Sequence, residues 1–237
     1  MDHTTLRGRI VSWSEAADNK DQGNRGGRSQ EDFVITKHSD GSRILRAFCE
    51  LYEHNLLRDV VLAMDANYRP LDCYVRVMVD DTLQGMAWFR FTETAAQCEA
   101  YTVREGRMSQ DLPMDKFVPT FATHAVQSDA WLLARYDLTQ GPGRQYFQDI
   151  PLCSSEHVGK TGPYIMSISS PIEYIGEEKV NVRAGTFVTH HFRFVDASNG
   201  HPPYDLWTSA DDNYLFVKAL VGGNWNTAFE LVELERD

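Results

Sequence analysis

Arginine and large aromatic side chains alternate with aliphatic ones through residues 72–92, and this pattern is the strongest chemical signal in the chain. Side chains point to opposite faces along a strand. Each strand of the predicted hairpin therefore has one aliphatic face and one face of aromatic residues, methionine and arginine. The second face suits an amphipathic cavity, where a guanidinium can hold a carboxylate or phenolate oxygen. The residues predicted to bind a substrate in this way are Arg46, Tyr74, Arg76, Trp88, Arg90 and, from the C-terminal half, Trp207.

The same alternation also fits an outward arrangement, in which the arginines stack on surface aromatics. A period of two does not say which face of a sheet is inside. An unpaired guanidinium in an apolar cavity is costly. The inward arrangement therefore requires partners such as Glu50, Glu99 or an anionic ligand oxygen.

Candidates for proton transfer lie in the C-terminal half. His190 and His191 are adjacent on a predicted strand, so they point to opposite faces and do not ligate one metal ion together. We predict His191, Tyr164 and Asp205 as catalytic residues, with Asp205 either pairing with a cavity arginine or orienting His191. The alternatives are a hydrogen-bonded core histidine and an aspartate that caps a turn.

The remaining motifs predict no metal site and no cofactor. Residues 151–163 combine cysteine, serine, glutamate, histidine and lysine, but they lack a G-x-S-x-G elbow and are typical of a rim loop. The glycines of residues 15–30 fit no phosphate-binding motif. The four cysteines contain no CxxC pair, which favours buried reduced thiols.

Turn signals divide most of the chain into short alternating segments, as in antiparallel sandwiches and barrels. We predict an all-β fold, an antiparallel meander that closes into a lipocalin-like barrel or two half-barrels, because closure removes exposed edges. One short helix is expected at 128–138, with Ser128 as its N-cap. Residues 1–237 form one domain in this interpretation, with a polar loop at 15–30 and a helix-containing connection at 117–143. The predicted strands are 6–13, 31–38, 43–53, 57–65, 72–80, 84–92, 97–105, 144–150, 163–169, 172–182, 186–196, 204–209, 213–221 and 226–235.

Charge and hydropathy narrow the range of partners. The 34 acidic and 23 basic residues give a formal net charge of -11, which repels phosphate backbones and argues against nucleic acid. No run of 18 apolar residues predicts a membrane span, and no basic segment followed by an apolar run predicts secretion. We therefore expect a cytoplasmic protein, and the aromatic content together with exposed strand edges favours a possible homodimer.

Residues 172–234 also carry a family resemblance. The segment EKVNVRAGTF at 178–187 leads to HHFRF at 190–194 and then to YDLWTSADDNYLFVK at 204–218. A strand, an AGTF turn, a return strand and a Trp-x-Ser-x-Asp segment resemble a family of uncharacterised bacterial β-barrel proteins. The resemblance implies an antiparallel, lipocalin-like or double-half-barrel architecture and brings no chemistry with it.

Two functions from different classes fit these residues best. The first is a cofactor-independent lyase or isomerase, in which arginine holds an anionic oxygen and tyrosine or histidine moves a proton. Its substrate would be a hydrophobic or aromatic oxygenated small molecule. The alternative is a non-catalytic carrier or sensor of hydrophobic small molecules. A third possibility is a structural domain whose arginine face is an intersubunit surface.

Overall fold

The computed structural model describes residues 2–14, 27–114 and 118–237. The N-terminal strands are β1 His3–Ser14, β2 Ser29–His38, β3 Arg43–Leu51, β4 Leu56–Met64, β5 Pro70–Val79, β6 Thr82–Phe91, β7 Ala95–Thr102 and β8 Gly106–Pro113. The C-terminal strands are β9 Gly143–Leu152, β10 Met166–Val182, β11 Gly185–Phe194, β12 Tyr204–Ser209, β13 Phe216–Val221 and β14 Thr227–Arg236. The helix is α1 Val126–Leu132, and short 3-10 turns follow at Leu133–Arg135 and Leu138–Gln140.

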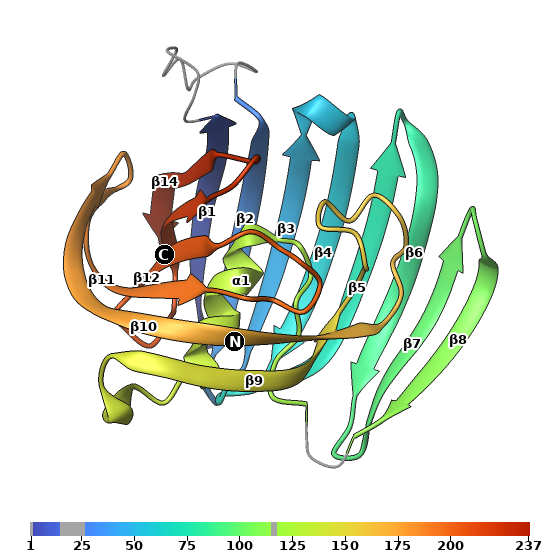
Figure 1. The fold of residues 1–237 in the computed structure, drawn as a ribbon, viewed down its shortest axis with the longest axis horizontal. Helices are drawn as coiled ribbons and strands as arrows, with labels where there is room; N and C mark the ends of the chain where they lie inside the picture. The colour runs from blue at the N-terminus through green and yellow to red at the C-terminus, as the bar shows by residue number, and fades with distance from the viewer. Residues whose placement is uncertain (1, 15–26, 115–117) are drawn as a thin grey trace.

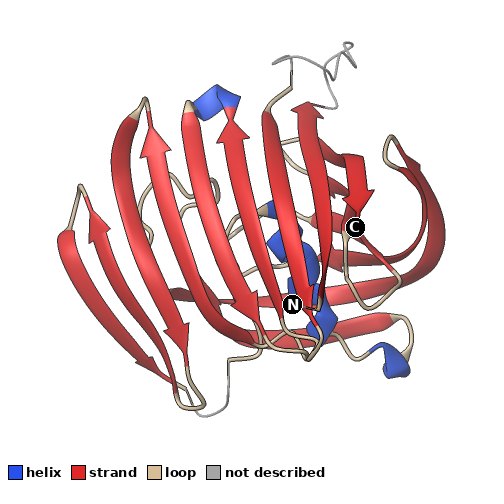
Figure 2. Cartoon of the chain, turned by 180° about the vertical axis from the view of Figure 1, so that it is seen from behind, coloured by secondary structure: helices blue, strands red, loops and turns tan. Residues whose placement is uncertain are grey.

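All fourteen described strands belong to one sheet with the order β8-β7-β6-β5-β4-β3-β2-β1-β14-β13-β12-β11-β10-β9. Every named pair is antiparallel, and the first strand pairs with the last, with Leu6 opposite Arg236. Strands β1 to β8 form one broad curved layer, and β9 to β14 curl back across its concave side with α1 between them (Figure 1). Figure 2 shows the convex side of the broad layer.

The predicted antiparallel meander is confirmed, and its unclosed sheet is compatible with the half-barrel alternative. No pairing between described strands joins β8 to β9, so these two remain the edges of the sheet. The core fills the space between the curled halves. It consists of side chains on the inward faces of the strands, for example Leu45 on β3, Val75 on β5 and Phe192 on β11.

Local turn chemistry explains the regular N-terminal hairpins. Asp80 and Asp81 connect β5 to β6 with φ angles of 49° and 57°. Aspartate tolerates this left-handed region, and a two-residue turn with positive φ at both positions matches the twist of its strands. The hairpin that the sequence predicts over residues 72–92 therefore forms with nearly the expected bounds.

The expected elements differ from the structure in three places. Strand β8 was not predicted, because its polar sequence GRMSQDLP has little apolar signal. The expected strands 163–169 and 172–182 are one strand, β10, with a register shift between Ile168 and Ser170. Residues 15–26 of the expected polar loop lie outside the described residues, and Ser29 and Gln30 belong to β2.

The helix starts earlier than predicted and is shorter. Ser128 is not the N-cap; it lies inside the first turn, where its hydroxyl donates to the Ala125 carbonyl at 2.7 Å. Ala125, which occupies the cap position, provides no side-chain acceptor. The first backbone N–H groups of a helix have no acceptor within the helix. Here two of them donate to the carboxylate of Glu31, a residue of the sheet.

Side-chain hydrogen bonds to main-chain atoms of the segment before β13 hold α1 in place. The Trp131 indole donates to the Asn213 carbonyl at 3.1 Å, and the Gln127 amide donates to the Tyr214 carbonyl at the same distance. On the other side of this segment, the Tyr68 hydroxyl donates to the Asp212 carbonyl at 2.5 Å. The segment therefore connects α1 to the broad layer of the sheet.

Candidate functional site

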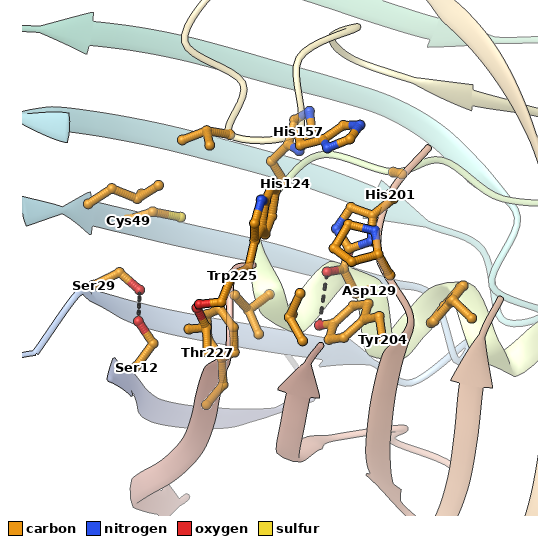
Figure 3. Close-up of a pocket in the computed structure, with 18 of the residues that line it drawn as sticks. Ser12, Ser29, Cys49, His124, Asp129, His157, His201, Tyr204, Trp225 and Thr227 are labelled. Carbon is orange, nitrogen blue, oxygen red and sulfur yellow. Dashed lines mark hydrogen bonds between the residues drawn. The ribbon is translucent and has the colours of Figure 1, made fainter. Parts of the chain in front are cut away.

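A cavity of about 420 Å³ lies between the broad layer, α1 and the C-terminal strands (Figure 3). Most of its wall is apolar, which suits a ligand that leaves water for a hydrophobic surface. The apolar lining residues are Leu51, Ala122, Val126, Leu132, Ile150, Leu152, Val158, Ile168, Phe194, Ala197, Pro202, Val221, Trp225 and Phe229.

Glu31 is a buried carboxylate in the cavity wall and anchors α1. Its side chain lies on the inward face of β2, the same face as the buried Phe33 and Ile35. Its two oxygens accept hydrogen bonds from the backbone N–H groups of Val126 at 2.5 Å and Gln127 at 2.9 Å. Burial raises the pKa of Glu31, while these N–H groups oppose the shift. Both oxygens are thus committed to the helix.

Arg58, on β4, is a guanidinium only 2% exposed to solvent, and it joins two loops. It donates to the carbonyl of His124, just before α1, at 2.9 Å and also to the carbonyl of Val158. Its Nε has no hydrogen-bond partner among the described residues. Gly159 allows the second loop to approach, since a Cβ atom there would lie 2.7 Å from Nη2 of Arg58.

His124 is a neutral histidine on the cavity wall. Burial lowers its pKa to about 3, and the nearby positive charge of Arg58 contributes to the shift. Its backbone has a φ of 62°, in the left-handed region, and its Nε2 has no partner among the described residues. His124 therefore faces the cavity as an uncharged ring at neutral pH.

Asp129 of α1 and Tyr204 of β12 meet at one end of the cavity (Figure 3). The Tyr204 hydroxyl donates to Oδ2 of Asp129 at 3.3 Å. Burial, together with the nearby Glu31 carboxylate, raises the pKa of Asp129 to about 7. Burial also raises the pKa of Tyr204 well above its ordinary value, so this phenol stays protonated. The pair thus combines a titratable carboxyl group with a neutral hydroxyl group.

Two histidines and a tryptophan form an aromatic wall next to this pair. The ring centroids of His157, His201 and Trp225 lie 5.2–5.4 Å apart. Nδ1 of His201 lies 2.7 Å from the Pro202 carbonyl, and Nε2 of His157 lies 3.0 Å from the Asn199 carbonyl. A carbonyl only accepts, so each of these nitrogens carries the proton and the other ring nitrogen has a lone pair. Burial also lowers the pKa of His201.

Several polar side chains that line the cavity near the start of β2 are partly exposed. Arg28 pairs with Glu53 at 2.8 Å, and their side chains are 30% and 47% exposed. Arg28 also donates to Thr227 Oγ1 at 2.6 Å. Nearby, the hydroxyls of Ser12 and Ser29 share a hydrogen bond of 2.6 Å (Figure 3).

The predicted arginine and aromatic residues do not line this cavity, and the inward arrangement was wrong for them. The aliphatic phase of the hairpin is the buried one, with Val75 and Phe89 fully covered, while Trp88 is 46% exposed. The outward phase carries the five residues predicted from the N-terminal half, Arg46, Tyr74, Arg76, Trp88 and Arg90. The core selects the aliphatic face because only that face buries without desolvating charge.

The residues predicted in the C-terminal half do come together, but away from the cavity. His191 stacks on Trp207 with ring centroids 4.0 Å apart, and its Nε2 lies 2.7 Å from the Asp205 carboxylate. Arg193 donates to the same Asp205 oxygen at 2.9 Å. They lie on the face of β11 and β12 opposite to the buried Leu206. Their predicted contact is present, whereas their catalytic role stays a prediction.

Tyr164 lies just before β10 and also does not line the cavity. Its hydroxyl shares a hydrogen bond of 2.6 Å with Ser155 of the preceding loop. That loop nevertheless contributes Val158 and His157 to the cavity, in keeping with its prediction as a rim loop.

The sequence analysis missed the charged residues that face the cavity. A signal for two of them was present: Glu31 and Arg58 interrupt the apolar phase of strands that are otherwise regular, beside Phe33 and Val60 respectively. A charge in a buried phase requires a partner or a function. Asp129 carried no comparable signal, because only the tertiary fold buries it.

No cluster of three histidine, cysteine, aspartate or glutamate side chains in the described part of the chain is placed to hold a metal ion. No helix among the described residues is long and apolar enough to cross a membrane.

The fold is similar to that of a solved structure of unknown function. A β-barrel-like protein of the domain of unknown function DUF1849 from Brucella abortus matches with a TM-score of 0.54 and 11% identity. The match covers 99% of this chain and 98% of that one. A DUF1089 family protein from Pseudomonas aeruginosa matches with a TM-score of 0.44 and 10% identity over 86% of this chain and 92% of that one. No family model and no curated protein matches the sequence. The resemblance to uncharacterised bacterial β-barrel proteins is confirmed at the level of fold.

Proposed function

We propose that the protein binds a small, predominantly apolar molecule in the cavity beneath α1. The observation that carries this proposal is the cavity itself: about 420 Å³ of space with mostly apolar walls and a few polar groups. Sites for small organic ligands have this size and composition. An apolar surface of this extent in contact with water also favours displacement of that water by a ligand.

The polar groups define the orientation of the ligand. Glu31 is occupied by α1 and Arg58 by two loop carbonyls, so these two residues build the wall. Asp129, Tyr204 and His201 remain available at one end. A ligand with one oxygen-containing group and an apolar body satisfies both parts of the cavity.

Fluorescence titration with N-phenyl-1-naphthylamine, an uncharged apolar probe, tests the proposal. We expect saturable enhancement of its emission with one site per chain. Val126→Trp fills the cavity from α1 and should weaken binding at least about tenfold, or roughly 1.4 kcal/mol. Ala197→Trp fills it from the segment between β11 and β12 and provides a second, independent block.

Val61→Trp is the matched control, because Val61 is 37% exposed and is not among the cavity-lining residues. It should bind the probe as the wild type does. Failure of the wild type to bind, or equal affinity of the blocking and control variants when all are folded, would contradict a ligand site in this cavity.

A cofactor-independent lyase or isomerase is the second candidate function. The observation that favours it is that Tyr204 contacts both the carboxyl group of Asp129, whose pKa burial raises to about 7, and the ring of His201, whose pKa burial lowers. Groups that gain and lose a proton near neutral pH suit general acid–base catalysis. On this proposal the acid–base residues are those of the cavity rather than His191 and Asp205.

A further inference from the structure

Three groups from separate elements converge on one end of the cavity. Asp129 comes from α1, Tyr204 from β12 and His201 from the segment that precedes β12 (Figure 3). Tyr204 contacts both partners: its hydroxyl lies 3.3 Å from Asp129 Oδ2, and its ring centroid lies 5.9 Å from that of His201. A ligand atom at this end of the cavity therefore meets a carboxyl group, a phenol and an imidazole.

Both oxygen groups can donate to a ligand oxygen when Asp129 is protonated and the Tyr204 O–H turns from Asp129 Oδ2 to the ligand. Burial keeps the Tyr204 hydroxyl protonated, and near neutral pH it keeps a large share of Asp129 protonated. No hydrogen bond among the described residues uses Oδ1 of Asp129. A phenol and a neutral carboxylic acid in an apolar site form an effective donor pair for an oxygen that gains negative charge.

His201 can accept a proton from the ligand. Its Nδ1 is committed to the Pro202 carbonyl, so Nε2 has the lone pair. Two other ionisable residues of the cavity are less suitable: both oxygens of Glu31 bind α1, and the pKa of about 3 makes His124 a weak base.

We propose that Tyr204 and Asp129 bind the carbonyl oxygen of an apolar ketone or enone, and that His201 removes a proton from the carbon next to this carbonyl. This inference rests on the proposed function, because the ligand occupies the same cavity. It names the substrate class as a carbonyl compound with an apolar body.

The proposed step needs no other reactant. Nε2 of His201 forms a bond to hydrogen as the C–H bond breaks, and the electron pair of that bond moves into the enolate. The enolate oxygen accepts hydrogen bonds from Tyr204 and Asp129. If the imidazolium first exchanges its proton with solvent, return of the solvent-derived proton to the same carbon gives isotope exchange. Return of a proton to a conjugated carbon gives isomerisation.

The first test compares two ligands that differ in one group. 2-Naphthol presents an oxygen like that of an enolate, and 2-methylnaphthalene has nearly the same shape without it. Each compound is titrated as a competitor that displaces N-phenyl-1-naphthylamine. We expect the wild type to bind 2-naphthol with an affinity at least about tenfold higher than that for 2-methylnaphthalene. Tyr204→Phe and Asp129→Leu should lose this preference, and Asp129→Asn, which retains an N–H donor, should keep part of it.

The second test measures proton transfer directly. We expect the wild type to catalyse exchange of the α-protons of 1-indanone with deuterium in deuterated buffer. Nuclear magnetic resonance measures the rate of this exchange. His201→Gln should slow the exchange at least about 100-fold, the lower range for a lost general base. His38→Gln is the matched control, because His38 at the end of β2 does not line the cavity.

The outcomes separate the two proposals. Failure of the uncharged probe to bind overturns the proposed function, and this inference with it. Binding of the probe without a preference for 2-naphthol leaves the proposed function standing and overturns the carbonyl site. Exchange no faster than in buffer, or unchanged in folded His201→Gln, overturns the role of His201 as a base.

Discussion

The cavity contains side chains that are costly to bury, and local hydrogen bonds offset much of that cost for two of them. Glu31 receives two helical N–H groups, and Arg58 donates to two loop carbonyls. Asp129 and His124 have fewer compensating contacts, so their protonation equilibria shift toward the neutral forms. Folding is therefore linked to pH through these two residues, with opposite signs.

For Asp129 we expect stability to fall as the pH rises. Its pKa is about 7 in the folded protein, against about 3.9 in an unfolded chain. Between these values unfolding releases a proton, so the stabilising contribution is complete below pH 4 and is lost by about pH 7. Asp129→Asn removes this dependence. Urea unfolding from pH 4 to pH 8 should show the variant gaining stability relative to the wild type up to about pH 7. A difference that does not vary with pH would contradict the shifted pKa.

For His124 the sign is reversed. Its pKa is about 3 when folded and about 6.5 when unfolded, so unfolding takes up a proton between these values. The contribution is complete above about pH 6.5 and is lost as the pH falls toward 3. We expect His124→Asn, which tolerates a φ of 62°, to gain stability relative to the wild type as the pH is lowered from 6.5 to 4. The same urea series measures it, and equal slopes in both proteins would argue against a buried neutral His124.

At the scale of elements, α1 connects the two halves of the curled sheet. Glu31 binds its first turn from β2, while Trp131 and Gln127 bind the segment before β13. A helix of 7 residues is too short to be stable alone. Its stability therefore comes from these contacts and from the core, and its position determines where Asp129 lies in the cavity.

Trp131 should be one of the side chains on which α1 depends most. It is fully buried and its indole is hydrogen-bonded, so we expect Trp131→Ala to lower the free energy of unfolding by about 3–5 kcal/mol. Trp88→Ala is the matched control on the outer face, where 46% exposure predicts a loss below about 1 kcal/mol. Chemical denaturation of both variants measures the two losses. Similar values for the two would contradict either the anchoring of α1 or the outward position of the hairpin aromatics.

At the scale of the whole molecule, the sheet is continuous and its two halves share a core. Strand β1 pairs with β2 on one side and with β14 on the other, and Ile10 of β1 is buried. The core residues extend from β1 to β14 and include those of α1. Neither half has a separate core of its own.

We therefore expect a single cooperative unfolding transition. Tryptophan fluorescence reports on both halves, since Trp88 lies on β6 and Trp207 on β12, and far-ultraviolet circular dichroism reports on the sheet. The two probes should give coincident curves in urea, as two-state unfolding requires. Two separated transitions would indicate that β1 to β8 and β9 to β14 unfold independently.

The sequence by itself determined the local structure of this protein. Alternation in the 72–92 hairpin and the turn at Asp80 and Asp81 predicted the strands and their pairing, because side-chain direction and turn geometry depend on a few neighbouring residues. The antiparallel meander followed from the regular spacing of such units. The polar strand β8 could not be predicted in this way, because it belongs to the sheet through its pairing with β7 and its own residues carry little apolar signal.

Only the tertiary structure decided which face is inside and where the cavity lies. The period of a strand is the same for either orientation, and the choice depends on what packs against it. Here the aliphatic face packs against the core, which left Arg76 and Arg90 outside the cavity. Pairing of β1 with β14 and the curl of the sheet then brought Glu31, Asp129 and Tyr204 together from positions 31, 129 and 204. Contacts over such separations depend on the whole fold, so no local pattern in the sequence could predict them.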